Sequence, residues 1–415
     1  MTSPRDASPI ATNSPVHPTP AQATFSGLRS RILVIFGTRP EAVKLCPLIL
    51  GLRRAAVHLP LDPVVCVTGQ HREMLEQVLS VFDVKPDIDL GVMRPGQSLT
   101  SLTSRLLAAL ESVFEQVQPA LAIVQGDTST TLAGALAAFY AGVPLAHVEA
   151  GLRTHDLRSP FPEEMNRTMA SRLATLHFAA TPWAAANLTA EGIPATQVEV
   201  TGNTGIDALL HVRDLLESGR LVPPPLSLPR EKKIIVVTAH RRESFGAGFR
   251  QICEAIAQLA LRPDVHVAWP VHLNPQVRKT VFGHLALHPN IEFLDPLPYV
   301  SFVDLMRRAY LLITDSGGIQ EEGPSLGKPI LVLREKTERP EAVVAGTVKV
   351  VGTATQAIVH EANRLLDDSA EYARMARLHN PYGDGHACGR IVQRIQAFLE
   401  SASMTTVAAD RVAAR

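Results

Sequence analysis

Residues 31–44 read RILVIFGTRPEAVK, and this stretch predicts the fold of the chain. It begins with an apolar run of the kind found in strands that are buried on both faces of a parallel sheet. Gly37 ends this run, Thr38 and Glu41 have the spacing of a helix capping box, and Pro40 suits a first helical turn. A strand followed at once by a helix is the first unit of a doubly wound α/β domain.

The same alternation of apolar runs and helix-length amphipathic segments continues along the chain, with a Pro-rich break at 222–229. Two such arrays separated by a linker predict two doubly wound, Rossmann-type domains. We expect the first domain at 29–205, completed by a C-terminal helix at about 386–400, and the second at 206–385. The further strands that the pattern predicts are 63–67, 120–124, 144–148, 233–238, 265–269, 291–294, 310–314 and 329–333.

Composition excludes several classes of protein. The 415 residues hold 40 Lys+Arg and 40 Asp+Glu, so the chain lacks the basic excess of a general nucleic-acid or anionic-membrane binder. No apolar run is long enough for a membrane span. Residues 1–28 contain five Pro and no secretory apolar run, which predicts a disordered tail. The four Cys are scattered and show no paired metal or disulfide pattern, which favours the cytoplasm.

Basic and glycine-rich residues follow strands in both halves, where open α/β sheets bind their ligands, so the cleft between the domains is the expected site. Arg39 and Lys44 follow the first strand at a helix N-terminus, which favours a phosphate or carboxylate contact over two merely solvated side chains. His240 follows the strand at 233–238 and can pair with phosphate or act as an acid. Ser316-Gly317-Gly318 lets backbone N–H groups approach a diphosphate, unless it is a plain left-handed turn. Glu322 is placed to bind a ribose diol.

Three acidic residues of the first half occupy comparable places. Asp127 follows the strand at 120–124, Glu149 directly ends the strand at 144–148, and Glu163 opens the next helix. An ordinary role exists for Asp127 as a helix N-cap and for Glu163 as a complement to the helix dipole. As a group, the three carboxyl groups can serve as general acids and bases.

Two familiar nucleotide motifs are absent from the sequence. No G-x-G-x-x-G follows a strand, so the dinucleotide fingerprint is missing. Gly318 and Gly323 have the spacing of a P-loop, but Pro324-Ser325 follows in place of Lys-Ser/Thr, which argues against a Walker-type NTPase. No metal-binding His or Cys pattern appears, and we expect neither cofactor nor metal.

Eleven stretches, taken together, resemble one family. They occur in the family's order over about residues 31–400, and they match the motif set of non-hydrolysing UDP-N-acetylglucosamine 2-epimerases. They read FGTRPEAVK, TGQHREML, QGDTSTTLAGALAAFY, HVEAGLRT, PFPEEMNR, GNTGIDALL, AHRRESFG, PVHLNP, TDSGGIQEE, PSLGKPILVLREKTERPEAV and NPYGDGHA. The resemblance implies a GT-B-like fold, with two Rossmann-type domains and the active site in the cleft between them. It also implies a homodimer that needs no cofactor.

The resemblance further implies the reaction. UDP-GlcNAc and UDP-ManNAc would interconvert by anti elimination of UDP to 2-acetamidoglucal and re-addition, supplying ManNAc-type sugars for surface polysaccharides. By motif, the catalytic residues would be Asp127, Glu149, Glu163 and His240. The substrate-binding residues would be Arg39, Lys44, Arg167, Leu297, Phe302, Ser316, Gly317, Gly318, Glu322 and Arg339. Some members carry Gln where this chain has Leu297. Residues matching a second, activating UDP-GlcNAc site are Gln70, His71 and His272.

Other functions remain open at this stage. A hydrolysing relative would share the fold and release UDP with free ManNAc, and the motifs TGQHREM and HRRES favour the non-hydrolysing branch. A GT-B glycosyltransferase would not need three carboxyl groups at one rim. A non-catalytic nucleotide-sugar sensor could keep Arg39 and Glu322 but dispense with those carboxyl groups. The sequence also leaves open a more decorated UDP-sugar and does not decide which carboxyl group is acid and which is base.

Overall fold

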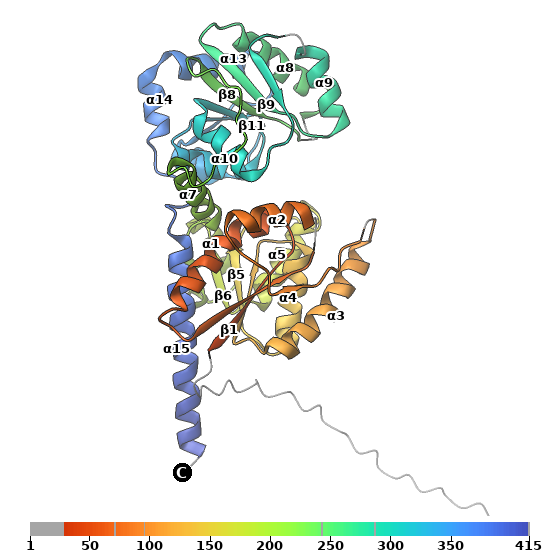
Figure 1. Ribbon diagram of the computed structural model, residues 1–415, viewed down its shortest axis with the longest axis vertical. Coiled ribbons are helices and arrows are strands. Elements are labelled where there is room, and N and C mark those ends of the chain that lie inside the picture. The colour runs from red at the N-terminus through yellow and green to blue at the C-terminus, as the bar shows by residue number, and fades with distance from the viewer. Residues whose placement is uncertain (1–28, 70–71, 95, 242–243, 286–287, 414–415) are drawn as a thin grey trace, which may run out of the picture.

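The computed structural model describes residues 29–69, 72–94, 96–241, 244–285 and 288–413. The chain forms two lobes, and each is a parallel sheet with helices on both faces (Figure 1). The tail predicted for residues 1–28 lies outside the described residues. None of the described helices has the length and apolar character needed to cross a membrane.

The first lobe contains a seven-stranded sheet in the order β3-β2-β1-β4-β5-β6-β7. Its strands are β1 (Ser30–Phe36), β2 (Leu61–Val67), β3 (Ile88–Asp89), β4 (Leu121–Gln125), β5 (Leu145–Ala150), β6 (Leu176–Ala179) and β7 (Val198–Val200). Its helices are α1 (Arg39–Ala55), α2 (Arg72–Val81), α3 (Leu99–Val117), α4 (Ser129–Tyr140), α5 (Glu163–Leu173) and α6 (Pro182–Ala190). The chain reverses its direction of winding between β1 and β4, which makes this the switch point where ligands of such sheets bind.

The second lobe repeats this plan with six strands in the order β10-β9-β8-β11-β12-β13, and its switch point lies between β8 and β11. Its strands are β8 (Lys233–Thr238), β9 (Val265–Pro270), β10 (Ile291–Leu294), β11 (Leu311–Thr314), β12 (Ile330–Val332) and β13 (Val348–Val350). Its helices are α8 (Ala247–Ala260), α9 (Pro275–Leu285), α10 (Tyr299–Arg308), α11 (Gly317–Glu322), α12 (Pro340–Ala345), α13 (Thr355–Asp367) and α14 (Ser369–Ala376).

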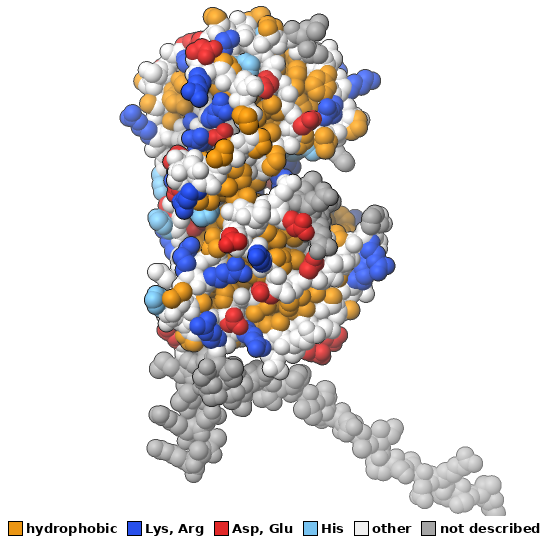
Figure 2. Space-filling model, in the orientation of Figure 1, with side chains coloured by type: hydrophobic (Ala, Val, Ile, Leu, Met, Phe, Trp, Pro, Cys, Tyr) orange, Lys and Arg blue, Asp and Glu red, His pale blue; other side chains and the backbone are white. Residues whose placement is uncertain are grey.

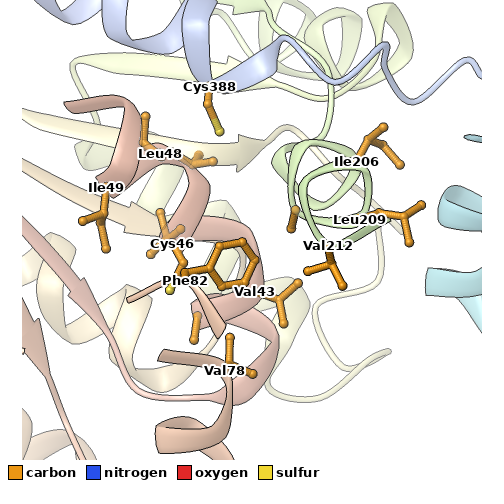
Figure 3. Packing of buried hydrophobic residues seen from close by; sticks show 14 of the residues in the cluster. Val43, Cys46, Leu48, Ile49, Val78, Phe82, Ile206, Leu209, Val212 and Cys388 are labelled. Carbon is orange, nitrogen blue, oxygen red and sulfur yellow. The ribbon is translucent and has the colours of Figure 1, made fainter. Parts of the chain in front are cut away.

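Helix α7 (Thr204–Glu217) lies between the lobes, and the C-terminal helix α15 (Ala387–Ala413) packs against α1 and α7. Val212 of α7 lies near Val43 of α1, whereas Ile206 and Leu209 point away from α1, and Cys388 of α15 lies near Leu48 of α1 in the same buried cluster (Figure 3). The same buried cluster continues into the second lobe through residues of α10 and α11. Because α7 packs against both lobes, the boundary predicted between residues 205 and 206 stays a prediction.

The predicted fold class is confirmed: both sheets are parallel and doubly wound. All nine predicted strands are present within two residues of their expected ends. The predicted C-terminal helix is also present, and it continues beyond the expected residue 400 to Ala413. The strands that the sequence pattern missed are β3, β6, β7 and β13, which have only two to four residues each.

Candidate functional site

The two switch points face one another across the space between the lobes. The positive charges of Lys44 and Arg39 in the first lobe oppose the rise that burial causes in the pKa of Glu322 in the second. The charge of Arg339 in the second lobe likewise opposes the effect of burial on the pKa of Glu149 in the first. The surface is indented between the lobes (Figure 2). The expected site residues therefore come together from strand ends of both sheets.

The first switch point is built around the buried carboxylate of Glu41. This carboxylate accepts the backbone N–H groups of Gly37 at 2.9 Å and Thr38 at 2.7 Å, and the capping box predicted for α1 is confirmed. Its other oxygen accepts the Thr128 hydroxyl at 2.7 Å. Glu41 thus fixes the turn after β1 against the turn after β4. Thr128 is also the N-cap of α4, so the alternative that Asp127 caps this helix is wrong.

Glu149 is held in its ionised form by its neighbours. Lys44 Nζ donates a short hydrogen bond to Glu149 Oε2, and Gln125 Nε2 donates to the same oxygen at 2.6 Å. Burial alone would raise the pKa of Glu149, but the charge and hydrogen bond of Lys44 bring it below its usual value. Burial likewise opposes the charge on Lys44, yet Glu149 and Glu321 raise the pKa of this amine above normal.

The backbone at Glu149 is unusual. Its φ is +62°, in the left-handed region that non-glycine residues seldom adopt, and the register of β5 against β6 shifts between Val148 and Ala150. Such a bulge re-aims a side chain at the end of a strand. Here it turns the Glu149 carboxylate out of the sheet and towards Lys44. Backbone strain of this kind is concentrated at functional sites.

Asp127 has a different electrostatic environment. Burial raises the pKa of its carboxyl group to about 6, although Arg167, whose Nη2 lies 3.3 Å from Asp127 Oδ2, opposes this rise. The negative charges of Glu149 and Glu163 raise the pKa further, which places all three predicted acidic residues near one another. The structure thus separates the titration of Asp127 from that of Glu149.

The two acids at the start of α5 have distinct surroundings. Glu164 is buried and accepts the backbone N–H groups of Thr154 and His155, each at 3.0 Å, while Arg167 Nε lies 3.4 Å from its other oxygen. Glu164 therefore fixes the loop that precedes α5. Glu163 is half-buried and is the member of the pair whose charge acts on Asp127.

In the second lobe, the turn after β11 carries Ser316, Gly317 and Gly318. Both glycines lie in the first turn of α11, so the alternative of a left-handed turn is wrong. A Cβ atom built on Gly317 would lie 3.5 Å from the guanidinium of Arg339, which places this arginine directly over the turn. Arg339 is held there by a short hydrogen bond from its Nε to Glu321.

Glu321 also fixes this part of the site to the helix that joins the lobes. Its second carboxylate oxygen accepts Asn203 Nδ2 at 2.7 Å, and Asn203 is the N-cap of α7. Asn380 Nδ2 donates to the Glu321 carbonyl oxygen at 2.7 Å. The arginine over the glycine turn is therefore connected to both segments through which the chain passes between the lobes.

Glu322 and Tyr299 of the second lobe lie near each other, and the predicted residues Leu297 and Phe302 belong to the same stretch of chain as Tyr299. Burial raises the pKa of Glu322 to about 7, and the negative charge of Glu321 adds to this effect. The hydroxyl of Tyr299 is buried and has no hydrogen-bond partner among the described residues, and burial and Glu322 raise its pKa well above the usual value. Leu297 and Phe302 are half-buried and pack against the core on either side of Tyr299.

His240 lies at the second switch point, next to the buried carboxylate of Asp315. Its Nδ1 is 3.2 Å from Asp315 Oδ1, and its ring stacks on His272 with centroids 5.2 Å apart. His272, predicted to bind a second nucleotide sugar, thus contacts a predicted catalytic residue. Gln70 and His71, predicted for the same second site, lie outside the described residues. Within the described part of the chain, no group of three or more His, Cys, Asp or Glu side chains is arranged to hold a metal ion.

A family model described as UDP-N-acetylglucosamine 2-epimerase matches residues 55–396 of the chain. The chain belongs to this family. It is 53% identical over 378 residues to a probable UDP-N-acetylglucosamine 2-epimerase of Ralstonia solanacearum, covering 89% of this chain and 99% of that protein. It is 51% identical over 372 residues to the UDP-N-acetylglucosamine 2-epimerase of Escherichia coli K12, covering 88% and 98%.

Solved structures of the UDP-N-acetylglucosamine 2-epimerase family share the fold. The Neisseria meningitidis enzyme bound to UDP-GlcNAc has a TM-score of 0.80 and 46% identity, and the match covers 88% of this chain and 100% of that one. The expected family and the GT-B-like architecture of two Rossmann-type lobes are both confirmed.

Several residues that build this site carry no sequence signal of their own. Gln125, Tyr299 and Glu321 contribute a hydrogen bond, a buried hydroxyl and an ion pair respectively. Gln125 and Glu321 lie inside the predicted motifs, and Tyr299 lies between the predicted residues Leu297 and Phe302, which is the signal that could have drawn attention to them. Asp315 lies in the predicted motif TDSGGIQEE, but its contact with His240 spans 75 positions of sequence and is visible only in the fold.

Proposed function

We propose that this protein interconverts UDP-GlcNAc and UDP-ManNAc without hydrolysing either, with its active site between the lobes. This proposal rests on one observation: carboxyl groups of the first lobe face a glycine turn and an arginine of the second lobe. Asp127, Glu149 and Glu163 lie on the first lobe, and a glycine turn with Arg339 lies on the second. Acid–base groups facing a diphosphate-binding turn are what removal and return of UDP require.

The chemistry is an elimination followed by an addition. A carboxylate takes the C2 proton, the C–H electron pair forms the C1=C2 double bond, and the C1–O bond breaks with its electron pair leaving on UDP. Return of a proton to the opposite face of C2 and attack of the UDP oxygen on C1 then give the epimer. Direct proton abstraction without loss of UDP would be slow, because no carbonyl group stands next to C2 to acidify its proton.

Different residues are proposed to bind UDP and to transfer the proton. Arg39, His240, Arg339 and the Ser316–Gly318 turn hold the diphosphate, Glu322 binds the ribose, and Phe302 faces the uracil beside Leu297. Arg167 faces Asp127 across 3.3 Å and fixes its orientation towards the sugar. Glu149 stays ionised through Lys44. Burial raises the pKa of Asp127 to about 6, closer to neutrality than the lowered pKa of Glu149, which suits a group that exchanges the C2 proton.

Turnover in D₂O tests the mechanism. We expect deuterium at C2 of both UDP-sugars, because a proton held on a carboxyl group between the lobes exchanges with solvent before one is returned. A small amount of UDP and 2-acetamidoglucal should also escape while the C1–O bond is open. NMR of the sugar protons measures both, and an inverted product without deuterium at C2 would rule the mechanism out.

The pH dependence tests the role of Asp127. With a pKa of about 6, Asp127 is ionised at neutral pH and becomes protonated below pH 6. A base that is lost on protonation makes kcat/KM fall about tenfold per pH unit on the acid side of its pKa. We therefore expect the kcat/KM of the wild-type protein to fall as the pH decreases below about 6. The residual kcat/KM of Asp127→Asn should not show this fall. A kcat/KM that rises as the pH falls below 6 would contradict the assignment of Asp127 as the base.

The alternative is a hydrolysing epimerase, in which water captures the intermediate and free ManNAc appears with UDP. The same NMR experiment separates the two, because free ManNAc has its own anomeric signal. We further propose that the protein works as a homodimer in the cytoplasm, without cofactor or metal, to supply ManNAc-type sugars for surface polysaccharides. His272, with Gln70 and His71, is proposed to contact a second UDP-GlcNAc.

A further inference from the structure

Asp315 occupies the second switch point as Glu41 occupies the first. It is fully buried at the end of β11 and touches the turn that follows β8. Its Oδ2 accepts the backbone N–H groups of His240 and Arg241, both at 2.7 Å, and its Oδ1 lies 3.2 Å from His240 Nδ1. One carboxylate therefore fixes the backbone at His240 and Arg241 by hydrogen bonds and lies within ion-pair distance of the His240 ring. It also directly precedes the glycine turn proposed to hold the diphosphate.

We propose that Asp315 is a positioning residue that keeps the proton of His240 on Nδ1 and leaves Nε2 for the diphosphate of the substrate. A carboxylate can only accept hydrogen bonds, so the ring nitrogen that faces it must carry a hydrogen. Protonation of Nε2 then gives a cationic ring whose Nε2–H donates to the departing UDP oxygen, while Asp315 stabilises the charge at Nδ1.

The surroundings of the ring support this arrangement. Burial would raise the pKa of Asp315, but the hydrogen bonds from His240 and the Arg241 N–H group and the charge of His240 lower it below normal, so the carboxylate stays ionised. The ring of His272 stacks on one face of His240, so this contact does not occupy the ring nitrogens of His240. The His240 side chain is 36% exposed, whereas Asp315 is not exposed at all, so the exposed edge of the ring is directed away from Asp315.

Asp315→Asn makes a specific test because the backbone decides how the new amide is oriented. The two N–H groups at Oδ2 require an acceptor, so the amide oxygen takes that position. The amide NH₂ group then faces Nδ1, which must become an acceptor. A neutral His240 ring is therefore forced to carry its proton on Nε2, the reverse of the wild-type arrangement.

This inference rests on the proposed function for its kinetic part only. In the Asn variant the ring can still donate from Nε2 to bound UDP, but the positive charge is no longer stabilised as UDP leaves. We expect kcat to fall about 10- to 100-fold, the range of a lost hydrogen bond between charged groups, while the Kd of UDP changes less than threefold. A purely structural role would instead weaken UDP binding and kcat together.

Ring ¹⁵N chemical shifts of His240 in the full-length, UDP-bound protein provide the direct readout, with His240→Gln identifying the signals. The matched control is Asp207→Asn, because Asp207 is also a buried carboxylate that accepts two backbone N–H groups, at 3.2 Å from Ala387 and 2.9 Å from Cys388. We expect Asp315→Asn alone to move the proton to Nε2. The control should keep the wild-type shifts and kcat.

A proton on Nε2 alone in the neutral wild-type ring, or an unchanged ring in Asp315→Asn, would overturn the proposal. The wild-type measurement decides even if the variant does not fold. Turnover of UDP-GlcNAc by the wild-type protein is a separate observation: its absence would contradict the proposed function and leave the result on the tautomer standing.

Discussion

Glu149→Gln is expected to lower the turnover of UDP-GlcNAc by about 10²- to 10⁴-fold, the usual effect of losing a positioned acid or base, while UDP still binds. The charge of Glu149 is maintained by Lys44 and by Gln125 at 2.6 Å, and its backbone is held at φ +62° to present it there. A neutral amide fits the same space but cannot accept a proton. Glu149 is not among the groups proposed to hold UDP, so the Kd of UDP should change little, which calorimetry with UDP can measure.

The control for this variant is a glutamate that is also paired with a basic residue but lies outside the proposed site. Glu191 receives hydrogen bonds from Arg153 at 2.6 and 3.0 Å, and this pairing lowers the pKa of its carboxyl group. Glu191→Gln should retain turnover within about threefold, because the amide oxygen can still accept a hydrogen bond from Arg153 and the pair contacts none of the proposed catalytic residues. Near wild-type rates in two of the three variants Asp127→Asn, Glu149→Gln and Glu163→Gln would refute the acid–base assignment.

The fold was largely predictable because its central strands are continuous apolar runs. β1, β4 and β8 lie in the middle of their sheets and are buried on both faces, so almost every residue in them is apolar. β3 consists of Ile88–Asp89 at a sheet edge and offers no such run. Strands this short exist because a neighbouring strand supplies their hydrogen bonds, which local sequence does not encode.

The site was predictable as a set of positions but not as a set of contacts. The rule that ligands bind at the carboxyl ends of parallel strands led to Asp127, Glu149 and His240. It could not distinguish Glu163 from Glu164, because both open the same helix and only the packing of the preceding loop buries Glu164. The ion pair of Lys44 with Glu149 joins residues 105 positions apart and depends on a bulge in β5.

Gly151→Ala should destabilise the protein by about 4 kcal/mol or more, because two separate costs coincide at this position. Gly151 has a φ of +90°, where an alanine is strained. A Cβ atom built there would lie 2.2 Å from the backbone oxygen of Ala184 and 3.0 Å from Leu188 Cγ. A backbone carbonyl cannot rotate away as a flexible side chain can, so α6 must shift relative to β5.

Gly142→Ala separates these two costs. Gly142 also has a positive φ, +66°, but a Cβ atom built on it would have no neighbour within 4 Å. Gly142→Ala should therefore lose only the stability that the strained backbone costs, about 1–2 kcal/mol. Urea unfolding of both variants measures the difference, which we expect to exceed about 2 kcal/mol. Equal losses of stability in the two variants would mean that α6 moves aside easily for the new methyl group. The close packing of Gly151 against α6 would then not be what holds the end of β5, and with it Glu149, in place.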